Sequence, residues 1–428
     1  MLGAGVTTLT FLLFISGQLL SFFTQTPRIM LFSTKGLGAA GLLSLPLVTP
    51  SAATLLYVAS YAGTVTTLNL TLSSGANYSA SLEAISTSTG CASSPSWLTL
   101  DTPNSVLYCT DEGLSTPLGS LSSFQTNDDG TLVQLDQISV ISGPVSAVIY
   151  GEDGDGLALA HYSGSGFSTF SIADPAALAP VQNETFTLAE PGPNPDRQDA
   201  PHPHEAILDP TGEYIIVPDL GADLVRIFQV DEDGLTWTAV DPLVAAPGSG
   251  PRHATFLVTD DATYMYLVAE LANTITGYKV EYESELAFTE LFAINTHGEG
   301  SSVPNGTTAA EIALSPDENF IIVSSRGENS FNIINFDPSN STEIVSDAIL
   351  TFSVDHSCGN LSFVQEFPAG GRVPRQFSIN KAGDLLAVGL QSDGRVVLID
   401  RDVKSGQLKR FAANALVEGE VTAVIFDE

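Results

Sequence analysis

Four residues in this sequence have side chains suited to acid–base chemistry on an anionic molecule. They are His204, Arg252, Glu270 and Arg326. A carboxylate with a suitably placed pKa can act as a general base, and an imidazole exchanges a proton near neutral pH. Two guanidinium groups can hold a carboxylate through paired hydrogen bonds or stabilise an oxyanion. The four residues are far apart in the sequence, so only a fold that gathers strand ends can make one site of them.

A repeated hairpin is the element that would gather them. Its clearest copy, residues 201–230, has two apolar runs joined by Asp-Pro-Thr-Gly at residues 209–212, and a third run that alternates. Proline presets φ for a tight turn and glycine tolerates positive φ, so the pattern predicts a β-hairpin followed by a third strand. Further copies begin about 50 to 65 residues apart, a period typical of propeller blades. They are residues 55–70, 95–113, 144–172, 251–280, 308–337 and 374–402.

The two ends of the chain predict how the ring closes. The first copy lacks its leading strand, and residues 421–426 (VTAVIF) form an isolated strand-like run. Pairing the two would remove an exposed sheet edge. No long segment keeps the period of an amphipathic helix. We therefore predict an all-β, seven-bladed β-propeller of four-stranded antiparallel blades, closed by the C-terminal strand pairing with the N-terminal blade.

The repeat also predicts which positions share one face of the ring, because the start of one strand lies beside the end of the next in an antiparallel hairpin. The position that ends each second strand holds Tyr61, Glu112, Ser163, Leu220, Glu270, Arg326 and Gln391, and the position before the first strand holds Ser96, Val145, His204, Arg252 and Arg375. We expect the long loops 191–199 and 297–308 at the mouth of a site on this face. The residues expected to contact substrate there are His161, His253, Arg375 and Gln391.

Each candidate also has an ordinary structural interpretation. Glu270 could pair with an arginine and merely hold adjacent blades together, and the histidines could be ordinary strand-end residues. His202 and His204 flank a proline without a nearby cluster of further ligands, so we predict no metal site. Several polar groups on one face of three consecutive blades favour a functional site over these alternatives.

Four segments resemble the seven-bladed propeller lactonase family, which includes bacterial-type 6-phosphogluconolactonases and the fungal carboxy-cis,cis-muconate cyclase. They read HPHEAILDPTGEYIIVPDLGADLVRIF, GPRHATF, YLVAELANTITGY and VSSRGENSF. The resemblance runs from Leu55 to the end and is specific in blades four to seven. It implies that His204, Arg252, Glu270 and Arg326 are the catalytic residues, in the family's order and strand positions, and that no metal or organic cofactor is needed.

Three functions are compatible with this resemblance. The first is hydrolysis of a sugar-acid or aromatic-derived lactone, with Glu270 as general base and the arginines and His204 stabilising charge. The second is a muconate-type cycloisomerase, in which a carboxylate adds across a double bond to form a lactone. The third is a binding propeller without catalysis, because this fold hosts many interaction modules.

The overall charge limits the choice of partners. The chain has 428 residues, with 49 Asp and Glu against 15 Lys and Arg, and a net charge of −34. Phosphate backbones need a basic surface, so nucleic-acid binding is disfavoured. We expect a small anionic lactone or dicarboxylate as the substrate, held by local positive charge.

The N-terminus predicts secretion. Met30 is followed by Lys35, an apolar run and small residues that end at Ala53, which is the layout of a signal peptide. We expect residues 1–53 to be a leader and residues 54–428 to form the propeller, with no membrane contact in the mature form. The alternative is a membrane anchor at residues 5–23.

Sequons and cysteines agree with an oxidising, extracellular compartment. Asn-x-Ser/Thr sequons, the acceptors of N-glycosylation, stand at Asn69, Asn77, Asn183, Asn305, Asn340 and Asn360. Cys91 precedes the first strand of its blade and Cys109 ends the second, so a disulfide between them is plausible, with two buried reduced thiols as the alternative. Cys358 would be left unpaired.

Overall fold

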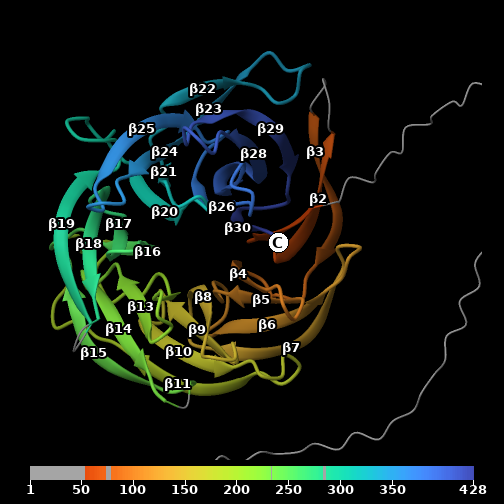
Figure 1. Ribbon diagram of the computed structural model, residues 1–428. Coiled ribbons are helices and arrows are strands. Elements are labelled where there is room, and N and C mark those ends of the chain that lie inside the picture. The colour runs from red at the N-terminus through yellow and green to blue at the C-terminus, as the bar shows by residue number, and fades with distance from the viewer. Residues whose placement is uncertain (1–53, 74–78, 233, 283–285) are drawn as a thin grey trace, which may run out of the picture. The chain divides into compact units, whose positions relative to one another are not determined.

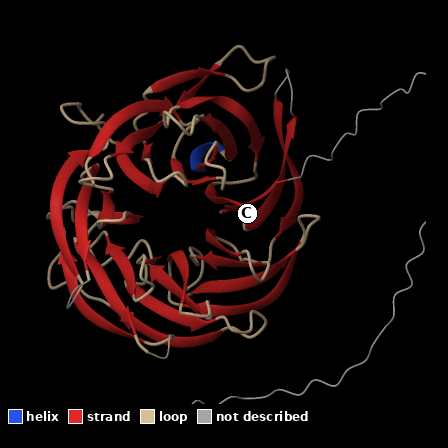
Figure 2. Ribbon diagram, in the orientation of Figure 1, coloured by secondary structure: helices blue, strands red, loops and turns tan. Residues whose placement is uncertain are grey.

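The computed structural model describes residues 54–73, 79–232, 234–282 and 286–428. By its internal contacts the chain divides into Met1–Pro50 and Ser51–Glu428. The first unit and the predicted leader lie outside the described residues. Apart from one short 3-10 helix, η1 (Gln391–Asp393), the described elements are all β-strands (Figure 2). None of the helices in the described part of the chain is long and apolar enough to cross a membrane.

Seven four-stranded antiparallel sheets surround a common axis, as predicted (Figure 1). The N-terminal blade consists, from the axis outward, of β30 (Val421–Phe426), β1 (Thr54–Ser60), β2 (Thr64–Ser73) and β3 (Ser79–Ser88). The next three are β4 (Pro95–Asp101), β5 (Val106–Asp111), β6 (Gly119–Thr126) and β7 (Leu132–Val140); β8 (Pro144–Tyr150), β9 (Gly156–His161), β10 (Gly166–Ser171) and β11 (Ala179–Thr185); and β12 (Ile207–Leu208), β13 (Tyr214–Asp219), β14 (Leu224–Val230) and β15 (Trp237–Val244). The last three are β16 (Pro251–Val258), β17 (Thr263–Ala269), β18 (Thr274–Glu281) and β19 (Ala287–Asn295); β20 (Thr308–Leu314), β21 (Phe320–Arg326), β24 (Ala348–Val354) and β25 (Leu361–Pro368); and β26 (Pro374–Ile379), β27 (Leu385–Leu390), β28 (Arg395–Arg401) and β29 (Leu408–Leu416).

The C-terminal strand closes the ring, which confirms the predicted pairing. β30 lies antiparallel to β1, with Tyr57 opposite Ile425. It also contacts both neighbouring blades: Thr422 Oγ1 donates to the carbonyl oxygen of Pro95 at 2.8 Å, and Val424 N–H donates to Gln376 Oε1 at 2.7 Å. The last strand of the chain therefore links the first, second and seventh blades.

The sixth blade differs from the prediction. The copy predicted at residues 308–337 should contain the third strand of this blade, but β22 (Phe331–Ile334) pairs instead with β23 (Glu343–Ser346) in an added two-stranded hairpin. β24 takes the third position beside β21. Burial accounts for the difference, because Ile334 is 88% exposed whereas Ile349 and Leu350 in β24 are fully buried.

Turn chemistry forms the hairpin of the fourth blade. Gly212 adopts φ +78° in the turn after Asp209. The carboxylate of Asp209 accepts hydrogen bonds from the N–H groups of Thr211 and Tyr214, at 3.1 and 2.8 Å. Because β12 has only two residues, the chain before it is held by an isolated bridge between Pro203 and Asp219. His204 lies between this bridge and β12, at the start of the blade.

The core lies between neighbouring blades, so most inner strands are buried on both faces. Every residue of β5, β9, β13 and β27 is buried, which is why these strands read as continuous apolar runs. Between the third and fourth blades, the rings of Phe167 and Phe228 stack at 4.1 Å and Trp237 packs against both. Burying one such side chain contributes roughly 2 kcal/mol.

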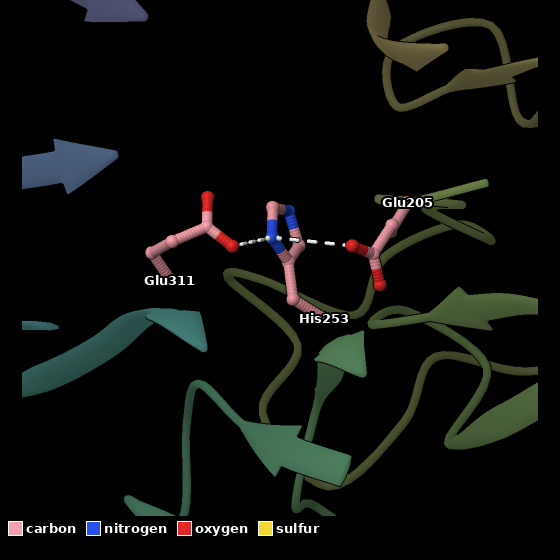
Figure 3. Close-up of side chains that lie close together, drawn as sticks. All are labelled: Glu205, His253 and Glu311. Carbon is pink, nitrogen blue, oxygen red and sulfur yellow. Dashed lines mark hydrogen bonds and ion pairs between the residues drawn. The ribbon is translucent and has the colours of Figure 1, made fainter. Parts of the chain in front are cut away.

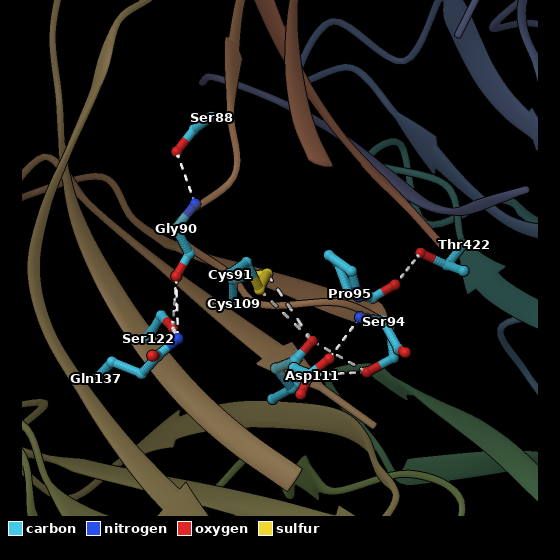
Figure 4. Close-up of a disulfide and its surroundings, with 12 residues drawn as sticks. Ser88, Gly90, Cys91, Ser94, Pro95, Cys109, Asp111, Ser122, Gln137 and Thr422 are labelled. Carbon is cyan, nitrogen blue, oxygen red and sulfur yellow. Dashed lines mark hydrogen bonds between the residues drawn. A yellow bond between two sulfur atoms is a disulfide. The ribbon is translucent and has the colours of Figure 1, made fainter. Parts of the chain in front are cut away.

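Cys91 and Cys109 form a disulfide (Figure 4), which confirms the predicted pair, and Cys358 is free. The Cα atoms of the pair are 5.9 Å apart, and both residues are fully buried. The bond joins the segment that leads into β4 to the middle of β5. Beside it, Ser94 N–H donates to Asp111 Oδ1 at 2.5 Å (Figure 4).

The predicted glycosylation sites differ in exposure. Asn69 is half-buried in β2, and its side-chain oxygen is buried and has no hydrogen-bond partner among the described residues. Asn77 lies outside the described residues. The side chains accessible to a glycan are those of Asn183, Asn305, Asn340 and Asn360, all of which are exposed.

Candidate functional site

A β-bulge places Arg252 beside Glu270. Pro251 pairs with Ala269 and His253 pairs with Val268, so Arg252 is the extra residue between them. Bulges redirect a side chain and often lie next to active sites. The N–H of Glu270 donates to the carbonyl oxygen of Gly250 at 2.8 Å, which brings the end of β17 next to the start of β16.

Three arginines surround the carboxylate of Glu270. Arg252 Nε and Arg326 Nη2 lie 2.9 and 2.8 Å from Glu270 Oε2. Arg197 Nη2 donates to Glu270 Oε1 at 2.5 Å. The structure thus brings together three of the four residues predicted to be catalytic and adds Arg197, which the sequence did not single out.

Arg197 comes from the long loop expected at the mouth of the site. It is the only basic residue of residues 191–199, and its side chain is 40% exposed. Gln198, which is fully buried, holds the loop by donating to the carbonyl oxygen of Leu220 at 2.9 Å and to Asp223 Oδ1 at 2.8 Å. The sequence feature that could have identified Arg197 is that it is a single basic residue in a loop that leads to this face.

The charges around Glu270 argue against the predicted general base. Burial disfavours its charged form, but the positive charges of Arg326, Arg252 and Arg197 outweigh burial and lower the pKa of Glu270 to about 2. Both oxygens of the Glu270 carboxylate also lie within ion-pair distance of arginine nitrogens, so neither is free to take a proton from water. The arrangement suits Glu270 as the partner that holds the arginines in place.

The guanidinium of Arg252 retains an unused donor. Its side chain is 2% exposed, and Nη1 has no hydrogen-bond partner in the described part of the chain. Nε lies within ion-pair distance of Glu270 but is not aligned to donate a hydrogen bond to it. Burial and the positive charge of Arg326 lower the pKa of Arg252 to about 9, so it still carries its charge at neutral pH. Buried donors nearly always have partners. A substrate oxygen could take this one.

His204 joins the site through His253, the neighbour of Arg252. His204 Nδ1 lies 3.2 Å from His253 Nε2, and the edge of its ring also meets Tyr162. Burial, together with the positive charge of Arg252, holds the pKa of His204 well below its usual range. His204 is therefore a neutral imidazole at neutral pH. Among the described residues, no hydrogen bond joins it directly to Glu270.

His253 lies between two buried glutamates that sequence reasoning did not select (Figure 3). Its Nδ1 is 2.9 Å from Glu311 Oε1 and 3.7 Å from Glu205 Oε1. Two carboxylates and an imidazole are a possible set of metal ligands, but the shorter distance is that of a direct hydrogen bond. The sequence feature that could have revealed this group is Glu311, because it is a charged residue inside the apolar run of β20. A second group of this kind is His297, Glu328 and Glu366.

A separate polar group joins the first, second and seventh blades. Arg375 Nη1 donates to the hydroxyl of Tyr61 at 2.7 Å, and its Nη2 donates to Glu112 Oε1 at 3.2 Å. All three residues belong to the columns predicted to share one face. Arg375 also helps to lower the pKa of His204. Its own charge is balanced by Glu112.

His161 and Gln391 do not join either group. His161 has no exposed surface, and its ring nitrogens lie 2.9 Å from the carbonyl oxygen of Ile141 and 2.6 Å from Ser168 Oγ. Burial lowers its pKa to about 3. Gln391 donates to Glu420 at 3.0 Å on the exposed surface. A substrate contact through either residue is therefore not supported, because the side chain of His161 is sealed inside its blade and that of Gln391 binds the C-terminal segment.

A family model described as "Lactonase, 7-bladed beta-propeller" matches residues 55–426. The chain belongs to this lactonase family. The matched residues cover the span of the resemblance from Leu55 onward, and with it almost all of the described propeller. The arginine cluster and the two histidines lie within the matched residues.

Relatives of this lactonase-family chain include fungal and bacterial proteins. It is 30% identical to the probable 6-phosphogluconolactonase of Arthroderma benhamiae over 76% of this chain and 78% of the relative. It is 26% identical to the 6-phosphogluconolactonase of Bacillus subtilis over 73% of this chain and 82% of the relative.

Solved structures support the fold. The periplasmic gluconolactonase of Pseudomonas aeruginosa has a TM-score of 0.69 at 24% identity, covering 87% of this chain and 99% of its own. A putative 6-phosphogluconolactonase of Bacteroides fragilis has a TM-score of 0.72 at 23% identity, covering 89% of this chain and 99% of its own.

Proposed function

We propose that this protein hydrolyses the lactone of a sugar acid, of the class of gluconolactone or 6-phosphogluconolactone. The observation that carries the proposal is the buried Arg252 guanidinium, which lies in a cluster of three arginines beside the neutral imidazole of His204. Its Nη1 finds no hydrogen-bond partner in the part of the chain that the structure describes. Membership of the lactonase family and the names of its relatives support this class of substrate.

The proposed roles follow from the needs of ester hydrolysis. Water must lose a proton as it attacks the lactone carbonyl, and the oxyanion that forms needs positive charge or hydrogen-bond donors. His204 takes the proton from water, and Arg252 and Arg326 stabilise the oxyanion. The ring C–O bond then breaks, and the protonated His204 returns the proton to the leaving alkoxide. Glu270 orients the arginines.

Arg197 gives the site its preference for anions. It lies at the more exposed edge of the cluster, where it can meet a substrate carboxylate or phosphate. The cluster has three cations for one carboxylate, so it is locally positive although the whole chain carries −34. Local charge of this kind is needed to attract an anion to an acidic protein.

Direct assay tests the proposal. The purified protein is offered gluconolactone, 6-phosphogluconolactone, aromatic-derived lactones and muconates, with acid release and ultraviolet absorbance as readouts. We expect acid release from a sugar lactone and a loss of about 10²- to 10⁴-fold in kcat for His204→Gln. The matched control is His356→Gln, an exposed histidine in the loop after β24. Cyclisation of a muconate, or no turnover of any compound, would contradict lactone hydrolysis.

We also propose that the protein is secreted after removal of residues 1–53. The leader pattern, the disulfide between Cys91 and Cys109 and the four exposed sequons support this proposal. N-terminal sequencing and intact mass of protein from the culture medium test it. An intact Met1 in a membrane fraction would contradict it.

A further inference from the structure

We propose that Glu311 and His253 form a hydrogen-bonded relay that fixes the tautomer of His204 and leaves its Nε2 free to accept a proton. The assignment of that proton to a substrate water rests on the proposed lactone hydrolysis. The tautomer itself rests only on the contacts among the three residues, so the two parts can be tested separately. Glu311 and His253 are positioning residues in this scheme, because they act through His204.

The three side chains form a continuous buried chain across three blades. Glu311 belongs to β20, His253 to β16, and His204 to the segment before β12. Figure 3 shows the carboxylate of Glu311 directed at Nδ1 of His253, at 2.9 Å. On the other edge of the ring, His253 Nε2 lies 3.2 Å from His204 Nδ1. The exposed fractions of the three residues are between 1% and 7%, so water competes little for these hydrogen bonds.

Hydrogen-bonding rules then determine where the protons are. A carboxylate only accepts, so Nδ1 of His253 must carry a proton and donate it to Glu311. Burial lowers the pKa of His253, so its ring is neutral and its Nε2 is an acceptor. His204 Nδ1 must therefore donate to His253, and since His204 is also neutral its Nε2 has no proton. No hydrogen bond from any described residue occupies this nitrogen.

The same chain stabilises His204 after it accepts a proton. The positive charge formed on His204 is connected through His253 to the negative charge of Glu311, and Nδ1–H of His204 strengthens its hydrogen bond as the ring becomes charged. Glu311 is held in place by a hydrogen bond from Ile312 N–H to the same Oε1, at 3.1 Å. Glu205 provides the contrast, because its Oε1 is 3.7 Å from His253 and its Oε2 accepts the N–H of Ala254.

Imidazole nitrogen NMR on protein labelled in histidine tests the tautomer without any substrate. Signals are assigned with His204→Gln and His253→Gln. We expect protons on Nδ1 of both rings and none on either Nε2. A proton on Nε2 of His204 would overturn the relay. A His253 ring without a proton on Nδ1 would also overturn it.

Kinetics on the active lactone tests whether Glu311 acts through His204. Glu311→Gln keeps the size of the side chain but removes its charge, and we expect kcat to fall about 10- to 100-fold with KM within about two-fold. Glu205→Gln is the matched control and should stay within about three-fold of the wild-type kcat, because Glu205 makes no short contact with His253. In a His204→Gln background, Glu311→Gln should cause almost no further loss.

Each alternative outcome has a distinct meaning. Equal losses from Glu311→Gln in both backgrounds would show that Glu311 stabilises the fold rather than His204, and would overturn the relay. If Glu311→Gln fails to fold, the wild-type NMR spectrum still decides the tautomer. If no lactone is hydrolysed by the wild-type protein, the proposed function fails, whereas the spectrum continues to test the hydrogen-bond order.

Discussion

At the scale of single residues, the balance of charge around Glu270 determines what each group can do. Glu270 is almost fully buried among Arg197, Arg252 and Arg326, and its pKa is lowered to about 2. The neighbouring His204 has its pKa lowered as well, by burial and by positive charges that include Arg252, Arg375 and Arg326. One group is thus held charged and the other neutral. This division suits an anion-binding arginine cluster next to an uncharged proton acceptor.

Glu270→Gln should change how stability depends on pH. A folded-state pKa of about 2, against the ordinary 4.5, corresponds to about 3 kcal/mol of stability at neutral pH. Because the folded pKa is depressed, this contribution is fully present above pH 4.5 and is lost as the pH falls toward 2. Denaturant unfolding at several pH values measures it. The variant should have a lower free energy of unfolding at neutral pH and should not lose this contribution as the pH falls. A pH profile of stability that matches the wild type would contradict the ion-pair cluster.

Arg197→Ala should weaken binding of an anionic lactone without unfolding the protein. Its side chain is 40% exposed, so solvent screens its charge, and we expect KM to rise about 5-fold with a small change in kcat. The matched control is Arg372→Ala, which removes an arginine that is 50% exposed and pairs with Asp393. Steady-state kinetics with a neutral and a phosphorylated lactone compares them. Equal effects of the two variants would exclude a local role for Arg197.

At the scale of elements, irregular strand ends place the functional groups. A bulge at Arg252, a two-residue β12 and a loop anchored by Gln198 all interrupt regular pairing on this side of the fourth and fifth blades. Regular ladders in the blades provide the rigid support, and the interruptions aim side chains away from the blade interior.

The disulfide should stabilise the second blade. Cys91 and Cys109 are 18 residues apart, and closing a loop of this size contributes about 3 kcal/mol. The double variant Cys91→Ala, Cys109→Ala should lose at least this much free energy of unfolding, whereas Cys358→Ser should change it little. Thermal melts with and without reductant check the effect. A wild-type melt that is insensitive to a reductant able to reach the bond would contradict it.

At the scale of the whole molecule, closure by β30 makes the stability of the ring depend on both ends of the described propeller. Val421 and Val424 are fully buried, and Phe426 is 8% exposed. Each such side chain contributes roughly 2 kcal/mol, against a total stability of about 5–15 kcal/mol for a typical domain. Loss of the strand would also expose the edge of β1 to other chains.

Deletion of residues 420–428 should therefore abolish the folded monomer. We expect aggregation or a loss of cooperative unfolding, measured by size-exclusion chromatography and thermal melts. Removal of Glu428 alone is the control, because this residue is exposed and lies beyond β30. A soluble truncated protein with a cooperative melt would show that β30 is dispensable.

The sequence by itself determined the repeat, the number of blades, the closing strand and the face on which Arg252, Glu270 and Arg326 meet. These features depend on local turn chemistry and on apolar periodicity, which neighbouring residues record directly. The exception was blade six, whose predicted copy ended at residue 337, whereas its third strand, β24, lies farther along the chain. The local sequence pattern does not show which later segment pairs with β21, so only burial in the folded blade selected the more apolar β24.

Only the tertiary structure decided the chemistry of the site. Arg197 lies in the site because of the path of its loop. Buried contacts of Gln198 with residues more than 20 positions away set that path. The role of Glu270 changed because a pKa depends on burial and on all nearby charges, which come from different blades. Glu311 and His253 became a candidate relay to His204 for the same reason: hydrogen-bond partners across blades leave no spacing signal in the sequence, and the separations of 2.9 and 3.2 Å exist only in the folded ring.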